Sequence, residues 1–214
     1  MKNLINKSYL STSVKEQHQK NFAEYLSSIL PILSYDYNNQ TLVISVLPEN
    51  LIFVLTTLKL HSCCQYSCLS AVSGVDYPQR ERRFEVVYDL LSVKYNSRVR
   101  VKTFVDEITP LTSAVSVFPA STWWEREVWD LFGVFFERND EIKRILTDYG
   151  FEGHPLRKDF PLTGHSEVRY SEEQKKVVSE PVKLEQNYRN FDYESPWEGT
   201  KYIKEEIDNN DKKD

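Results

Sequence analysis

The 214-residue chain lacks the short motifs that usually announce an activity. It has no glycine-rich phosphate loop, no serine nucleophile elbow and no Cys-x-x-Cys pair. No two of its four histidines stand at a spacing that places two metal ligands on one element. We therefore expect no catalytic residue, no metal site and no bound cofactor on this chain.

Long apolar runs and excess positive charge are also missing. No run approaches the roughly 18 apolar residues needed to cross a bilayer, so we expect membrane association only through partners. A formal net charge of -5 argues against general nucleic-acid binding. The length fits one domain of ordinary size with appendages.

Cysteine is scarce and clustered. Cys63, Cys64 and Cys68 lie within six residues, and there is no fourth cysteine. Because an iron-sulfur cluster normally needs four ligands, we interpret the three as buried free thiols in a reducing compartment.

What is present in the first half predicts an α+β fold, with helices packed on one face of a mostly antiparallel sheet. Alternating apolar residues between Phe84 and Leu90 indicate a strand with one buried face, and residues 75–83 before it are expected to form a solvated loop. The predicted elements are a helix over residues 14–30, strands over 32–37 and 41–47, a helix over 51–60, and strands over 65–75, 83–95 and 98–105.

A short helix follows in the sequence STWWEREVWDLFG. Ser121 or Thr122 is placed to cap it, with Glu125 completing a capping box, and Gly133 is placed to end it.

Side chains of this helix fall on distinct faces. Trp124, Val128 and Leu131 share an apolar face. Arg126 and Asp130 stand four residues apart, and we expect them to form an ion pair covered by the following segment.

After a second amphipathic piece around Ile142 and Leu146, the sequence loses all periodicity. The run TDYGFEGHPLRKDFPLTG (residues 147–164) has three glycines, two prolines and no apolar stripe. Such a run is uncommon in a compact domain unless it is functional or packed on something else. We interpret it as a segment that lies on a partner.

The remaining residues form a long, irregular C-terminal extension. Residues 171–214 contain twelve acidic and eight basic side chains, a strand is predicted over 177–182, and the last residues are expected to be disordered. The predicted organisation is an α+β domain over 1–120, a short helix with a docking loop over 121–170, and an acidic tail over 171–214.

The run at 147–164, preceded by WEREVWDLFGVFF and followed by EVRY, closely resembles the signature of one respiratory complex I subunit. That family is the 30-kilodalton or C subunit of NADH:ubiquinone oxidoreductase, also called NADH dehydrogenase subunit nine. VDYPQRERRFEVVYDLLS (residues 75–92) and RNFDYESPWE (residues 189–198) match the same family.

The resemblance implies a scaffold in the peripheral arm. Its expected partners are the quinone-site subunit and its iron-sulfur neighbour, while FMN and iron-sulfur clusters are carried by other subunits. The implied location is the matrix side of the mitochondrial inner membrane, or the cytoplasmic face of a bacterial plasma membrane. The residues we expect at subunit interfaces are Arg126, Asp130, Phe151, Glu152, His154, Arg157, Asp159, Phe160, Arg169, Tyr170 and Trp197.

Two other hypotheses come from different functional classes. One is a free-standing hydrolase that uses Glu127, Asp130 and His154, and the other is an RNA-binding module that uses Arg157, Lys158 and nearby aromatic residues. The first predicts turnover by the purified chain, and the second conflicts with the charge balance.

Overall fold

A computed structural model describes residues 20–38, 41–184, 186, 189 and 191. The chain divides into two compact units, Met1–Gly164 and His165–Asp214. The organisation with limits at residues 120 and 170 stays a prediction.

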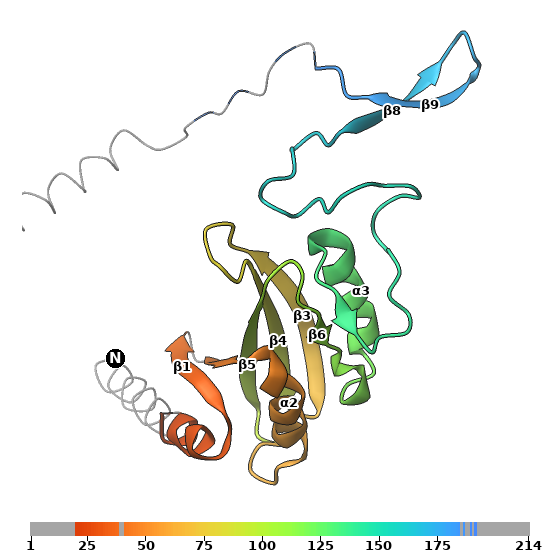
Figure 1. The fold of residues 1–214 in the computed structure, drawn as a ribbon. Coiled ribbons are helices and arrows are strands. Elements are labelled where there is room, and N and C mark those ends of the chain that lie inside the picture. The colour runs from red at the N-terminus through yellow and green to blue at the C-terminus, as the bar shows by residue number, and fades with distance from the viewer. Residues whose placement is uncertain (1–19, 39–40, 185, 187–188, 190, 192–214) are drawn as a thin grey trace, which may run out of the picture. The chain divides into compact units, whose positions relative to one another are not determined.

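The first unit is built on a five-stranded sheet with strand order β1-β2-β5-β4-β3 (Figure 1). Its strands are β1 (Ile32–Asn38), β2 (Thr41–Val46), β3 (Cys68–Asp76), β4 (Phe84–Ser92) and β5 (Ser97–Val105). Three neighbouring pairs are antiparallel, and β2 and β5 are parallel. The mostly antiparallel sheet is confirmed, and the parallel pair arises because β3, β4 and a helix intervene between β2 and β5.

Helices and short elements surround this sheet. Residues 20–29 are helical, and residues 14–19 of the predicted first helix lie outside the described part of the chain. The other elements of the first unit are η1 (Pro48–Asn50), α2 (Leu51–Leu60), β6 (Leu111–Thr112), η2 (Ala114–Ser116), α3 (Ser121–Phe132) and β7 (Phe136–Glu137). Among the described residues, no helix combines the length and apolarity needed to cross a membrane.

The helices cover one face of the sheet, as predicted. The alternating residues of β4 from Phe84 to Leu90 and the inward face of α2 belong to one buried core. α3 packs against β3 at Gly74, where an added Cβ would lie 2.7 Å from the Phe132 ring. Because Gly74 pairs across the ladder with Val86, α3 covers the same face as the buried residues of β4.

One local prediction about this region is wrong. Ala120 stands at the N-cap of α3 and no side chain caps the helix, because Glu125 points into the core instead of forming a capping box. The amphipathic piece around Ile142 and Leu146 forms neither helix nor strand, and its backbone turns toward an acidic side chain of α3. The predicted helix end is confirmed, with Gly133 in the left-handed region at φ +79°.

The second unit contains an antiparallel hairpin of β8 (Ser166–Ser171) and β9 (Lys176–Pro181), drawn in blue in Figure 1. The strand predicted over 177–182 corresponds to β9. β8 falls where no regular element was predicted.

Candidate functional site

The signature segment, residues 144–164, is held to α3 by the buried carboxylate of Asp130. This side chain is fully buried and accepts five hydrogen bonds from the start of the segment. The amides of Ile145, Leu146 and Thr147 donate at 3.2, 2.8 and 3.0 Å, and the Thr147 hydroxyl donates at 2.6 Å. Arg144 Nη1 completes the set at 3.1 Å and also donates to the Gly153 carbonyl.

These donors determine the charge state of Asp130. Burial acts to raise the pKa of the carboxyl group, but the hydrogen bonds from the Thr147 hydroxyl and from the amides of residues 145–147 outweigh it. The pKa falls from 3.8 to about 2, so the anchor is a carboxylate at neutral pH.

The middle of the signature segment caps the C-terminus of α3. The His154 side chain, the Leu156 amide and the Arg157 guanidinium donate to the carbonyls of residues 130, 131 and 132 at 3.0, 3.0 and 2.7 Å. The Gly133 amide donates to the carbonyl of Trp129, the residue before these three. The last carbonyls of the helix are thus satisfied, and a cationic side chain lies at the negative end of the helix dipole.

His154 has a defined tautomer in this arrangement. A carbonyl oxygen only accepts, so Nδ1 carries the proton that His154 donates to Asp130 O. Burial lowers the pKa of His154, and the charges of Arg157 and Arg144 lower it further, against the opposing effect of that hydrogen bond. The ring also lies edge-on to Trp129, with centroids 5.5 Å apart. This histidine is a neutral structural group at neutral pH.

A second buried aspartate holds the end of the signature segment. Asp76 accepts from Arg83 Nε at 2.7 Å, from Arg83 Nη2 at 2.9 Å and from the Lys158 amide at 2.7 Å. Arg83 also pairs with Asp159 at 2.8 Å and with Glu107. The Arg83 hydrogen bonds lower the pKa of Asp76. Arg83 is therefore a part-buried bridge. Residues 78–82 are exposed, as expected of a solvated loop, but that prediction is wrong for Asp76 and Arg83.

Four large apolar residues of the signature segment are exposed. Leu146, Tyr149, Leu156 and Leu162 are 60%, 102%, 49% and 83% exposed. Several polar groups of the segment thus bind the fold, while these four apolar side chains face solvent. Exposed apolar groups gathered on one segment are typical of an interaction surface.

The expected ion pair between Arg126 and Asp130 does not form. Arg126 Nε donates to the Lys143 carbonyl at 3.2 Å, and its guanidinium lies over the Trp123 ring at 4.7 Å. Asp130 pairs with Arg144 instead, because the chain returns to α3 14 residues later.

The other expected interface residues differ in accessibility. Asp130, His154, Arg157 and Asp159 bind groups of their own chain, as described above. Phe151 and Phe160 are half-buried with ring centroids 6.0 Å apart, and Glu152 is exposed. Arg169 and Tyr170 are exposed on β8, and Trp197 lies outside the described residues. Their role at an interface stays a prediction.

The geometry does not support the hydrolase alternative. His154 contacts the Asp130 main-chain carbonyl rather than its carboxylate, and all five donors to that carboxylate come from residues 144–147. No proton relay from Glu127 through these groups exists in this arrangement. The geometry does not support the RNA-binding alternative either, because Arg157 Nε donates to the Phe132 carbonyl at the end of α3.

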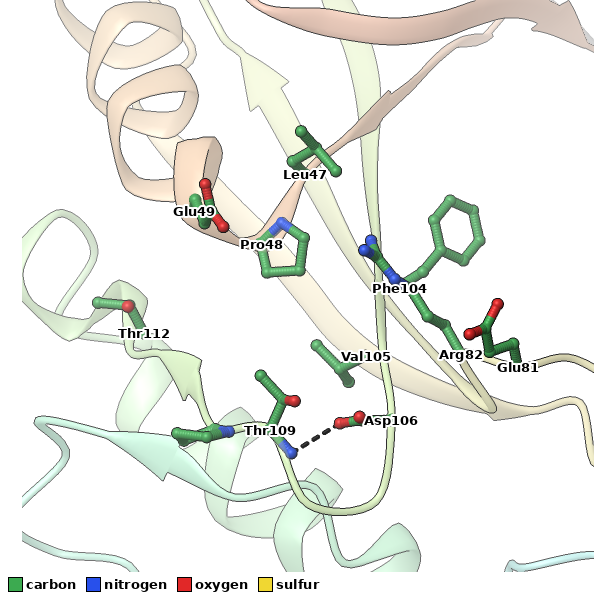
Figure 2. Close-up of a pocket in the computed structure, with 11 residues that line it drawn as sticks. Leu47, Pro48, Glu49, Glu81, Arg82, Phe104, Val105, Asp106, Thr109 and Thr112 are labelled. Atoms are coloured by element: carbon green, nitrogen blue, oxygen red, sulfur yellow. Dashed lines mark hydrogen bonds between the residues drawn. The ribbon is translucent and has the colours of Figure 1, made fainter.

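A cleft of about 440 Å³ lies elsewhere in the first unit, beside the ends of β2 and β5 (Figure 2). Glu49, Glu81, Asp106 and Arg82 line it among apolar residues, and Asp106 accepts from the Thr109 amide at 2.6 Å. The residues of the hydrolase alternative, Glu127, Asp130 and His154, do not line this cleft, so it gives that alternative no support.

Sequence reasoning also missed a third buried carboxylate, Glu125. It accepts from the Ser113 hydroxyl at 2.6 Å, from the Ala114 amide at 2.8 Å and from Asn139 Nδ2 at 2.9 Å. These contacts tie α3 to the chain on both sides of it. Its burial could have been predicted from the sequence, because Glu125 lies three residues before Val128 and so on the same face of the helix.

The three cysteines do not fit a cluster site. The prediction of buried thiols is confirmed for Cys64, whose Sγ lies 3.7 Å from His61 Nδ1, and is wrong for Cys63 and Cys68, which are exposed. Burial raises the pKa of Cys64 to about 11, and the nearby Cys63 adds to this, so the buried thiol stays protonated at neutral pH. In the described ranges, no group of three or more His, Cys, Asp or Glu is arranged to hold a metal ion.

Comparison with known proteins gives consistent results. A family model described as "Respiratory-chain NADH dehydrogenase, 30 Kd subunit" matches residues 44–166. NADH-ubiquinone oxidoreductase subunit 9 of Reclinomonas americana is 52% identical, over 88% of this chain and 89% of its own length. The C subunit of the NADH-quinone oxidoreductase of a Chelativorans species is 59% identical, over 76% of this chain and 81% of its own length.

Two further comparisons concern chemistry and fold. An Arabidopsis thaliana relative, 60% identical over 68% of this chain and 76% of its own length, is named iron-sulfur protein 3 of NADH dehydrogenase. The three cysteines of the present chain do not supply the four ligands that an iron-sulfur cluster normally needs. A chain in the structure of an archaeal membrane-bound sulfane sulfur reductase, a respiratory membrane complex, superimposes with a TM-score of 0.58. It is 26% identical and covers 68% of this chain and 86% of that one. The present chain belongs to the 30 kDa subunit family of the respiratory-chain NADH dehydrogenase, complex I.

Proposed function

We propose that this chain is a scaffold of the peripheral arm of NADH:ubiquinone oxidoreductase, binding the quinone-site subunit and its iron-sulfur neighbour. FMN and the iron-sulfur clusters are carried by other subunits, so the chain contributes to electron transfer by holding its neighbours in place. We place this arm of the complex on the matrix side of the mitochondrial inner membrane.

One observation carries the proposal. Asp130 and Asp76 hold the signature segment against the rest of the first unit through its amides, while four large apolar side chains of the segment stay exposed. Burying each such side chain at a partner contributes on the order of 1.5 to 3 kcal/mol. A segment ordered before binding also loses less conformational entropy on docking.

The test is recovery of the tagged full-length chain from membranes, with mass spectrometry of the co-purifying proteins. The wild-type chain should bring down the quinone-site and iron-sulfur subunits, and Leu156→Ser combined with Leu162→Ser should lose them without lowering the thermal transition. Ile108→Ser is the matched control, because Ile108 is 89% exposed outside the signature segment. Normal recovery of both subunits by the double variant would refute the docking role.

A further inference from the structure

The β8–β9 hairpin sorts its side chains by charge. Cross-strand pairing places Ser166 opposite Pro181, Val168 opposite Ser179, and Tyr170 opposite Val177. Because cross-strand partners share a face, these six residues form one side of the hairpin, and none is charged. We call this side the uncharged face.

The opposite face has the reverse composition. Its paired residues are Glu167 with Glu180, Arg169 with Val178, and Ser171 with Lys176. Arg169 binds the Glu180 carboxylate through Nε and Nη2 at 2.8 and 3.0 Å. This bidentate pair sits at the surface, where charged groups remain hydrated.

The uncharged face is open within the described part of the chain. Val168, Tyr170 and Val177 are 66%, 55% and 65% exposed. The sheet to which they belong has two strands. A two-stranded hairpin is marginally stable in water unless its apolar face is covered.

The size of the face indicates what kind of partner covers it. Three large side chains burying about 150 Å² each supply far less than the roughly 800 Å² per partner of a stable protein interface. A second copy of this chain held by this face alone would dissociate. A subunit that already contacts the chain elsewhere gains from such a small addition, since the second contact is intramolecular.

We propose that the hairpin is a separate docking element that lays Val168, Tyr170 and Val177 on an apolar, uncharged surface of a neighbouring complex I subunit. The Arg169–Glu180 face remains in solvent. This inference rests on the proposed function, because it needs a chain that assembles with other subunits. The family-model match ends at residue 166, so this surface lies almost wholly beyond it.

Adjacent valines on opposite faces provide the test. Val177→Glu and Val178→Glu make the same chemical change on neighbouring residues, one on each face. In full-length chains, Val177→Glu should lower the fraction found in assembled complex by about tenfold or more, the effect of a loss of about 1.4 kcal/mol. Val178→Glu, which faces Arg169, should change it less than about twofold.

Other outcomes overturn the proposal. Equal losses for both variants would show a general effect on the hairpin, and no loss for either would show that the face is not buried in the complex. If Val177→Glu lowered the thermal transition temperature of the isolated chain and Val178→Glu did not, the uncharged face would be covered by another part of this chain. If Val177→Glu changed the mass of the isolated protein in solution, the uncharged face would be covered by a second copy. If the wild-type chain failed to co-purify with any complex I subunit, the proposed function would fall first.

Discussion

At the scale of single residues, the buried carboxylates explain why a segment with no helical or strand period is still ordered. Asp130 replaces the regular hydrogen bonds of residues 145–147 with one acceptor group. The donors come from residues 14 to 17 positions away, which a search for pairs three or four apart cannot find. The pairing of Asp130 with Arg126 is therefore wrong, and the role of Asp130 at a subunit interface stays a prediction.

Asp130→Asn should destabilise the purified full-length chain strongly. Asparagine presents an amide group to donors that need a carboxylate, and removing one partner of a buried pair costs roughly 3 to 5 kcal/mol. Urea unfolding measures the change. Glu127→Gln, three residues earlier on the half-buried part of the same helix, should stay within about 0.5 kcal/mol of wild type. A loss below about 1 kcal/mol for Asp130→Asn would show that the anchor is dispensable.

The same carboxylate predicts a pH dependence. The pKa of Asp130 is lower in the folded chain, about 2, than the ordinary 3.8, so its contribution is present above about pH 4 and is lost as the pH falls toward 2. The stability gap between wild type and Asp130→Asn should therefore narrow by about 1 to 2 kcal/mol between about pH 7 and about pH 2.5. Urea titrations at both pH values measure it, and a constant gap would contradict the assignment.

Two arginines distinguish the observed pairing from the one expected from sequence. Arg144→Ala removes a charged donor to Asp130 and should cost about 1.5 to 3 kcal/mol. Arg126→Ala removes a part-exposed contact and should cost about 0 to 1 kcal/mol. Urea unfolding of the two variants measures both losses of stability. A larger loss for Arg126→Ala than for Arg144→Ala would indicate that Asp130 pairs with Arg126.

At the scale of elements, the end of α3 joins the helix to the signature segment. Gly133 lies in the left-handed region, and an added Cβ would stand 2.6 Å from His154 Nε2 and 2.5 Å from Arg157 Nη2. Glycine is needed here both for its backbone conformation and for the approach of these two capping side chains.

Gly133→Ala should therefore cost more than a left-handed alanine alone. Gly150→Ala is the matched control, because Gly150 has φ +73° and nothing within 4 Å of an added Cβ. Each variant carries a backbone cost of about 1 to 2 kcal/mol, and displacing His154 and Arg157 should add about 1 to 3 kcal/mol to the first. Thermal unfolding measures the loss of stability in each variant. Equal losses would show that His154 and Arg157 move aside without cost.

Elements with a clear period were predictable from the sequence. α2 occupies the predicted residues 51–60, and its face of Leu51, Val54, Leu55 and Leu58 is fully buried. The apolar face expected on α3 was only partly right: Val128 is buried, whereas Trp124 and Leu131 are half-buried and Glu125 lies inside. A buried carboxylate is stabilised by distant donors, which periodicity does not report.

Long-range pairings were not predictable in the same way. The parallel pairing of β2 with β5 depends on where the chain returns after 50 residues, and no local pattern encodes that. β8 was missed because its alternating face is short and followed a glycine- and proline-rich run. The signature segment was singled out by composition and resemblance, while the hydrogen bond from the Lys158 amide to Asp76 joins distant parts of the chain and required the fold.

At the scale of the whole molecule, we predict that folding and assembly depend on different parts of the chain. The first unit contains its own core and includes the signature segment, and the division of the chain falls between Gly164 and His165. In our proposal, the hairpin of the second unit contacts other subunits.

The most direct test is a chain that ends at Gly164. Its purified form should show a cooperative thermal transition, because the core and both aspartate anchors are retained. In cells that lack the full-length chain, it should fail to restore the assembled complex on native gels. Normal assembly with full NADH:quinone activity would contradict the docking role of the second unit, and the absence of any cooperative transition would contradict the independence of the first.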